Sequence, residues 1–159
     1  MRGGVDFVEC GVFHGVLSKT ICDYLDFGTF KESKFYLIDT WGKAIGSHPS
    51  PRYQDDIFES VSARFSNHKN VNLIRGVIPK ILSDVTSNKI GYLSIDLNDH
   101  EAERSVLEYF YDKIITGGVI YFDDYSGFPK TREMINDFFR DKPENLLHFP
   151  TGQSIVLKV

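Results

Sequence analysis

The chain has 159 residues, of which 42% are hydrophobic and 25% charged, a composition that suits one soluble globular domain with a sizeable core. Its net charge of −4 disfavours nucleic acid and anionic membranes as partners, and no run of residues is apolar enough to span a membrane. The two cysteines, Cys10 and Cys22, lack metal-ligand spacing and indicate a reduced, cytoplasmic protein. We therefore expect a single domain over residues 1–159, whose first strand begins so early that N-terminal covering helices are missing.

The stretch 5–20, VDFVECGVFHGVLSKT, predicts a strand, a glycine turn and a helix. Its first residues are an apolar run typical of a buried parallel strand, and Glu9 ends that run. Gly11 and Gly15 follow at a spacing of four, and Ser18 lies in the helix beyond them. Glycines let the backbone turn tightly and approach a ligand, and the start of a helix offers free N–H groups. An acid at the strand end favours a hydroxyl or a cation over a phosphate.

The pattern E-x-G-x-x-x-G lacks the middle glycine of the dinucleotide fingerprint, because Phe13 stands there. It therefore favours S-adenosylmethionine, whose ammonium group and ribose suit an acid-lined pocket, over NAD. Three alternatives stay open: an ordinary glycine turn, an NAD-dependent oxidoreductase, and a non-catalytic domain that binds S-adenosylmethionine.

Strands and helices alternate through most of the remaining chain. In the first half we expect a helix over 16–27 that Gly28 ends, a strand over 34–39, a loop over 41–52, a helix from Pro51 to about 66 and a strand over 71–75. A short helix around 79–85 and a strand over 90–96 follow, and then a helix over 102–115 that Thr116, Gly117 and Gly118 close. The chain ends with a strand over 119–123, a helix over 129–140, and strands over 146–149 and 154–159. Such alternation predicts an α/β fold, a doubly wound, Rossmann-like, mostly parallel sheet with helices on both faces. The last two strands add an antiparallel C-terminal hairpin.

Four predicted strands end in an acid, at Glu9, Asp39, Asp96 and Asp123, and Asp124 follows the last of them. Ligands bind at the carboxyl ends of the strands in sheets of this kind. Asp39 lies 24 residues after Gly15, close to the usual separation for an acid that hydrogen-bonds ribose hydroxyls. Each acid alone could equally cap a loop or a helix start.

Asp96, Asp123 and Asp124 follow strands that we expect to be neighbours. Three converging carboxylates repel one another unless a cation lies among them. Ligation by oxygen alone suits Mg²⁺, Mn²⁺ or Ca²⁺ rather than zinc.

Other candidate residues are weaker. His14 and His100 could each act as a base, although a lone histidine in a loop is more often merely solvated. Trp41 and Tyr125 stand where a ligand could stack, and Trp41 suits the core equally well. The loop 41–52 is typical of a lid or a binding segment.

Several of these segments resemble known methyltransferases. ECGVFHGVLS and FYLIDTW resemble the first and second motifs of class I S-adenosylmethionine-dependent methyltransferases. IRGVIPKIL, SIDLNDHEAERSVLEYFYDKIITGGVIYFDDY and PTGQSIVLKV together resemble the macrocin O-methyltransferase family, which acts on sugar and other hydroxyls of natural products. The resemblance covers nearly the whole chain and implies a seven-stranded sheet with an antiparallel final strand.

The resemblance also implies where the ligands bind. The cofactor would lie over Gly11 and Gly15, with its ribose held by Asp39 and its methionine carboxylate held in part by Ser18. The complete set of expected cofactor-binding residues is Glu9, Gly11, Phe13, Gly15, Ser18, Asp39, Thr40, Gly76 and Asp96. A divalent metal, usually Mg²⁺, would bind Asp96, Asp123 and Asp124.

The proposed base of well-studied members is an acid two residues after the first metal ligand, and this chain has Asn98 there. Asp99 or His100 could serve instead, metal coordination alone could acidify the substrate, or the activity could be lost. The D-x-N form with Glu103 after it also looks like a recurring variant of the family. We expect an S-adenosylmethionine-dependent methyltransferase (EC 2.1.1 class) that methylates a hydroxyl of a small molecule, with a homo-oligomer left open.

Overall fold

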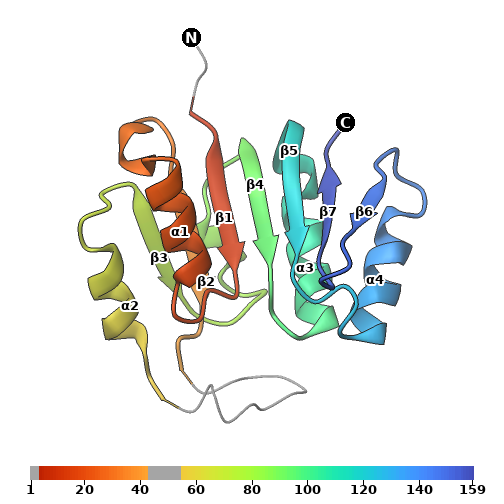
Figure 1. Ribbon diagram of the computed structural model, residues 1–159, viewed down its shortest axis with the longest axis horizontal. Helices are drawn as coiled ribbons and strands as arrows, with labels where there is room; N and C mark the ends of the chain where they lie inside the picture. Colours follow the sequence, from red (N-terminus) through yellow and green to blue (C-terminus); the bar gives the residue numbers. More distant parts are fainter. Residues whose placement is uncertain (1–3, 43–54) are drawn as a thin grey trace.

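A seven-stranded sheet forms the centre of the molecule, in a computed structural model that describes residues 4–42 and 55–159 (Figure 1). The strand order is β3-β2-β1-β4-β5-β7-β6. The strands are β1 Asp6–Cys10, β2 Phe35–Asp39, β3 Val71–Arg75, β4 Ile90–Ile95, β5 Ile114–Phe122, β6 Leu146–His148 and β7 Ser154–Leu157. The first five are parallel, whereas β7 runs antiparallel to both β5 and β6, so the predicted sheet and its closing hairpin are confirmed.

Helices cover both faces of this sheet, and each face has its own apolar core. The helices are α1 Val16–Tyr24, α2 Phe58–Phe65, α3 His100–Phe110 and α4 Pro129–Phe139. Strand β2 shows how one sequence serves both cores, because Phe35 and Leu37 pack with α1 and α2, whereas Tyr36 and Ile38 pack into the core that α3 and α4 cover. A strand buried on both faces is the reason that FYLI reads as a continuous apolar run.

The turn after β1 requires its two glycines. Gly11 has a φ of 87°, and a Cβ atom there would lie 1.7 Å from the backbone oxygen of Asp96. Gly15 has a φ of 70° and precedes the first residue of α1, and its Cβ would lie 2.7 Å from the ring of Phe65. Both positions combine a left-handed backbone with a close neighbour, so the turn can pass tightly over the ends of β1 and β4.

Two of the predicted helices differ from the structure. The helix predicted over 16–27 ends at Tyr24, and Gly28 lies inside a separate short 3₁₀ helix, η1 Phe27–Thr29, rather than ending α1. The short helix predicted around 79–85 is a turn followed by a 3₁₀ helix, η3 Leu82–Asp84.

The helix predicted over 102–115 begins earlier and ends earlier, because Asp99 caps α3 and the chain changes to a 3₁₀ turn, η4 Tyr111–Lys113. The prediction that residues 116–118 close this helix is wrong. Ile114 already begins β5, and Gly117 donates its backbone N–H to the oxygen of Lys158 at 2.8 Å. Ile114 is buried, so its apolar side chain fits the period of the preceding helix and the core position of a strand equally well.

The predicted start of a helix at Pro51, and most of the predicted loop 41–52, lie outside the described residues. Residues 55–57 are described and are not helical, and α2 begins at Phe58. Within the described ranges, no helix has the length and apolar character that crossing a membrane requires.

The glycine turn gives a direct test of the fold. Gly11→Ala should lower the free energy of unfolding by about 2 kcal/mol or more, because an L-residue in the left-handed region is strained and the new Cβ meets the Asp96 backbone. Gly28→Ala is the matched control, since nothing lies within 4 Å of its Cβ position. Urea unfolding of both variants measures the difference. Equal losses would show that the close approach of Gly11 to β4 is not a constraint on the fold.

Candidate active site

The carboxylate of Asp39, at the end of β2, fixes the glycine turn. Its Oδ2 accepts hydrogen bonds from the backbone N–H groups of Val12 at 2.7 Å and Phe13 at 2.8 Å, and its Oδ1 accepts one from the N–H of Trp41 at 2.8 Å. The hydroxyl of Thr40 donates a longer bond, 3.4 Å, to the same Oδ1. Asp39 therefore has a structural role already, and its contact with a ribose stays a prediction.

Two further residues that we expected near the cofactor lie around Asp39. Gly76, after β3, donates its backbone N–H to the oxygen of Asp39 at 3.0 Å, and a Cβ there would lie 2.5 Å from Ile81. The backbone oxygen of Thr40 accepts a bond from Nε of Arg75 at 3.2 Å. The ends of β2 and β3 thus form one hydrogen-bonded unit beside the turn.

Trp41 supports the turn rather than offering a surface for a ligand. Its side chain is only 1% exposed, and its Nε1–H donates to the backbone oxygen of Phe13 at 3.0 Å. The idea that Trp41 stacks on a ligand is therefore wrong, because the residue is buried in the apolar core on the α1 and α2 side of the sheet. Tyr125 is partly exposed and donates its hydroxyl to Oδ1 of Asn136 at 2.9 Å.

Glu9 and Ser18 are buried polar residues on either side of the turn, with exposed fractions of 2% and 0%. Oε2 of Glu9 and Oγ of Ser18 have no hydrogen-bond partner among the described residues. Burial and the charges of Asp96 and Asp39 together raise the pKa of Glu9 to about 8, although the neighbouring Ser18 hydroxyl lowers it. Ser18 lies close enough to act on the Glu9 carboxylate, and Oε2 of Glu9, without a partner among the described residues, fits a polar or cationic ligand group, because orphaned buried polar atoms are rare in folded proteins.

The structure brings the remaining strand-end acids together at the carboxyl edge of β4 and β5. Burial, together with the charges of Asp123, Asp124 and Asp39, raises the pKa of Asp96 to about 7. Burial and the charge of Asp123 also raise the pKa of Asp124. Within the described part of the chain, no lysine or arginine forms an ion pair with Asp96, Asp123 or Asp124. Negative charge thus accumulates here without a protein cation to balance it.

The chemistry of these carboxylates suits a divalent cation, since all of them offer oxygen. In their present positions, however, they form no group of three that could hold a metal, as judged over residues 4–42 and 55–159. Oδ1 of Asp123 accepts bonds from the Tyr121 hydroxyl at 2.7 Å and from Nε2 of Gln153 at 3.2 Å. Oδ1 of Asp96 accepts one from Nδ2 of Asn98 at 3.2 Å.

The three residues that we considered for the catalytic base have separate surroundings. Asn98 has a φ of 55° and contacts Asp96 as described. Asp99 is the N-cap of α3, and its Oδ1 accepts bonds from the backbone N–H groups of Glu101 at 3.0 Å and Ala102 at 3.2 Å. His100 is the first residue of α3 and faces a hollow between α3 and α4. Their catalytic roles stay predictions.

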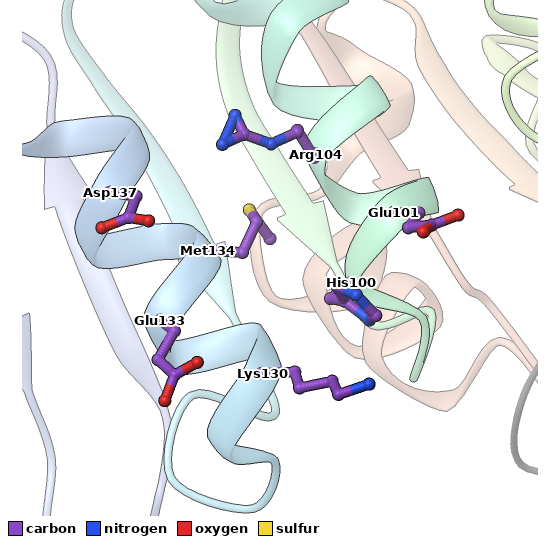
Figure 2. Close-up of a pocket in the computed structure, with 7 residues that line it drawn as sticks. All are labelled: His100, Glu101, Arg104, Lys130, Glu133, Met134 and Asp137. Atoms are coloured by element: carbon purple, nitrogen blue, oxygen red, sulfur yellow. The ribbon is translucent and has the colours of Figure 1, made fainter.

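This hollow has a volume of about 490 Å³, and Figure 2 shows His100 and Lys130 beside it, at the N-terminal ends of the two helices. Charged side chains of both signs, among them Arg104 and Glu133, line it, and Met134 from α4 adds an apolar surface. The mixed charge favours no single class of ligand.

Three residues of the site were not among the expected site residues. Glu103 is 2% exposed, burial raises its pKa to about 8, and its Oε1 accepts the N–H of Leu97 at 3.3 Å. A signal existed, because Glu103 shares a helix face with Val106 and Phe110. Tyr121 could have been found from the two-residue period of its strand, whereas nothing local in the sequence pairs Gln153 with Asp123.

The chain was compared with known proteins. A family model described as a methyltransferase domain matches residues 8–125. Among solved structures, the O-methyltransferase NovP has a TM-score of 0.80 at 18% identity, and the match covers 98% of this chain and 72% of NovP. CalS11, described as a TDP-rhamnose 3′-O-methyltransferase of calicheamicin biosynthesis, has a TM-score of 0.69 at 16% identity, covering 96% of this chain and 71% of CalS11.

A third structure, SMU.1697c, is a putative methyltransferase from Streptococcus mutans in complex with S-adenosylhomocysteine (SAH). Its TM-score is 0.67 at 13% identity, with 99% of this chain and 90% of that chain covered. No curated protein matches the sequence. At these identities the structures show the shared fold, while the family match spans most of the chain. The chain therefore belongs to the methyltransferase domain family.

Proposed function

We propose that this protein is an S-adenosylmethionine-dependent O-methyltransferase that acts on a hydroxyl of a small molecule. The observation that carries the proposal is the carboxyl edge of the sheet, where a glycine turn held by Asp39 stands beside buried, uncompensated acids. A cationic methyl donor fits both features of this edge. The glycine turn lets the backbone approach the donor closely, and the buried acids offset its positive charge.

The related structures support the substrate class and the cofactor. NovP is an O-methyltransferase, CalS11 is described as a TDP-rhamnose 3′-O-methyltransferase, and the S. mutans protein was solved with SAH. The matched family model supports a methyltransferase over an NAD-dependent oxidoreductase on the same kind of sheet.

The residues of the site then have distinct tasks. S-adenosylmethionine, when bound, supplies a methyl group on a positively charged sulfur. Gly11 and Gly15 let the backbone approach this ligand, and Glu9 and Asp96 offset its charge. Methyl transfer would require the site to align the acceptor oxygen with the methyl group, so that the C–O bond forms as the C–S bond breaks, and a base would take the hydroxyl proton. The protein therefore contributes mainly alignment, charge and removal of a proton.

The magnesium dependence that the family resemblance implies remains part of this proposal. Asp96, Asp123 and Asp124 would hold the ion, which would lower the pKa of the acceptor hydroxyl and neutralise their mutual repulsion. We also propose that the chain belongs to the macrocin O-methyltransferase family and that the protein is cytoplasmic. A homo-oligomer is part of the same proposal.

Cofactor binding tests the proposal first. Isothermal titration of the protein should show saturable binding of SAH and none of NAD⁺. With S-adenosylmethionine and a panel of sugars and phenols, mass spectrometry should detect a product 14 Da heavier, the mass of one added CH₂. Binding of NAD⁺ without SAH would reverse the proposal, whereas SAH binding without any product would favour a non-catalytic binding domain.

Asp39→Asn should weaken SAH binding at least 10-fold and lower the free energy of unfolding by about 1–3 kcal/mol, because Asp39 accepts backbone N–H groups of the turn through a charged oxygen. Asp112→Asn removes an exposed acid of η4 and should change neither quantity. Titration calorimetry and urea unfolding give the two values. A variant that binds SAH as the unmodified protein does would remove Asp39 from the site.

The raised pKa values predict how stability depends on pH. Glu9 at about 8, Asp96 at about 7 and Glu103 at about 8 lie well above the values near 4 of an unfolded chain, so the folded protein binds more protons in between. The free energy of unfolding of the ligand-free protein should therefore fall as pH rises from 6 to 8.

Glu9→Gln should flatten this dependence and stabilise the protein at pH 8, because it removes a buried charge. Glu59→Gln, at an exposed position of α2, is the control. Denaturant unfolding at pH 6 and pH 8 measures both variants. Stability that rises over this interval would contradict the accumulation of buried acids.

A further inference from the structure

On the face of the sheet where α1 and α2 lie, helices cover only one half. Phe35 of β2 and Tyr92 of β4 pack into the core beneath these helices. The same face continues across the sheet, because Tyr92 pairs with Val119 of β5, and Val119 pairs with Leu157 of β7. Val119 and Leu157 belong to neither apolar core. Figure 1 shows α3 behind β5 and β7 and, within the described chain, no helix in front of them.

The strands of the uncovered half have apolar side chains on both faces. Val156 of β7 is fully buried in the core that α3 and α4 cover, whereas Leu157, on the opposite face, is 47% exposed. On β6, Leu147 pairs with Ile155, faces the same side as Leu157 and is 50% exposed. A continuous apolar run such as 155–157 is typical of a strand that is covered on both faces. The uncovered strand surface consists of Val119, Tyr121, Leu147, Ile155 and Leu157.

The exposed side of α1 forms a second apolar surface on the same face of the sheet. A Cβ atom on Gly15 would meet the ring of Phe65, so this flank of the helix faces α2. Leu17 and Tyr24, seven residues apart, share the flank that points away from α2 and toward the uncovered strands. Both are exposed, Tyr24 to 87%, and Val16, also exposed, lies on the outward side of the helix. α1 therefore presents apolar side chains to whatever packs on this face.

The two apolar surfaces of one copy match those of a second copy. α1 lies over one half of the face, and the uncovered strand surface is the other half. A two-fold axis parallel to the strands, between two copies turned face to face, exchanges the halves and places α1 of each copy over β5 and β7 of the other. Such an axis keeps the level along the strands. Tyr24, at the end of α1, lies near the amino ends of the parallel strands, as Leu157 does, so it would meet Leu157 of the partner subunit.

The two surfaces are large enough for a stable contact between copies. The exposed parts of the apolar side chains supply roughly 500 Å², near the upper end of the patches of about 300–600 Å² found on monomers, and the residues are Val16, Leu17, Tyr24, Leu147 and Leu157. Surrounding polar atoms bring this area toward the ~800 Å² that each partner contributes to a standard interface. No large apolar side chain of α3 or α4 is among the exposed ones, so the apolar area is confined to one side of the molecule.

We propose that a second copy of this chain covers the uncovered strand surface, in a two-fold dimer in which α1 of each copy packs on β5 and β7 of the other. The interface is isologous, because each copy supplies the same helix and the same strands. No charged side chain belongs to the uncovered strand surface, which favours an apolar helix over a charged peptide as its occupant. The inference rests on the homo-oligomer of the proposed function, whose interface it names, and not on methyl transfer.

Sedimentation velocity of the full chain tests the dimer, which should have twice the 18.2 kDa mass of one chain. Tyr24→Lys and Leu157→Glu should each weaken the dimer at least about 10-fold, because each buries an unpaired charge in the interface. Glu108→Lys is the matched control, since it changes the charge at an exposed position of α3, on the opposite side of the sheet, and should leave the dimer unchanged.

An equimolar mixture of the Tyr24→Lys and Leu157→Glu proteins tests the arrangement itself. In the mixed dimer the introduced lysine of one copy faces the introduced glutamate of the other, while the second pair of contacts is unmodified. The mixture should therefore dimerise more tightly than either variant alone. A mixture that stays as weak as its components overturns the two-fold arrangement.

The remaining outcomes also decide. A dimer that neither variant weakens overturns the proposal, because its interface then lies elsewhere. A monomeric unmodified protein overturns it as well, and binding of the dye ANS that Leu157→Glu abolishes would then assign the surface to a different chain. If circular dichroism shows Leu157→Glu to be unfolded, Tyr24→Lys decides alone, since Tyr24 is almost fully exposed in one copy.

Titration with SAH separates this inference from the proposed function. Every variant should bind SAH as the unmodified protein does, because Tyr24 and Leu157 lie away from the carboxyl edge of the sheet. A protein that dimerises as described and does not bind SAH overturns methyl transfer and leaves the interface intact. A monomer that binds SAH does the reverse.

Discussion

Repulsion among carboxylates at one edge of the sheet is the constraint on which the site depends. Parallel strands place their carboxyl ends together, so the acids that end β1, β2, β4 and β5 must share one side of the molecule. Burial keeps water from screening them, and the pKa values of Glu9 and Asp96 rise as a result. Such an arrangement is unfavourable in the free protein, and the cationic methyl donor that we propose would relieve it.

The acids at this edge of the sheet differ in their hydrogen-bond partners. The carboxylate of Asp39 accepts backbone N–H groups of Val12 and Phe13 in the glycine turn and of Trp41, so it holds the shape of the turn. Glu9 keeps an unpartnered buried oxygen. Asp123 is tied on one side to Tyr121 and Gln153. Acids that look equivalent as strand-end residues therefore differ in what they can still bind.

The C-terminal hairpin also has a part in the site. Strand β7 inserts between β5 and β6 in the antiparallel direction, which brings the turn before it to the carboxyl end of β5. Gln153 reaches Asp123 for this reason. If β7 were parallel to β5, the end of β7 would lie there instead, and Gln153, which precedes the strand, would be at the opposite edge of the sheet.

The sequence by itself determined the alternation of elements, the sheet class, the hairpin and the acids at the strand ends, because apolar periodicity and strand-end position are local properties. It misplaced the boundary between α3 and β5, where buried Ile114 fits either period. Only the tertiary structure decided what each side chain contacts. The burial of Trp41, the bonds of Asp39 to the turn and the pairing of Gln153 with Asp123 join residues far apart in the chain, and such contacts depend on strand order and close packing, which local patterns do not encode.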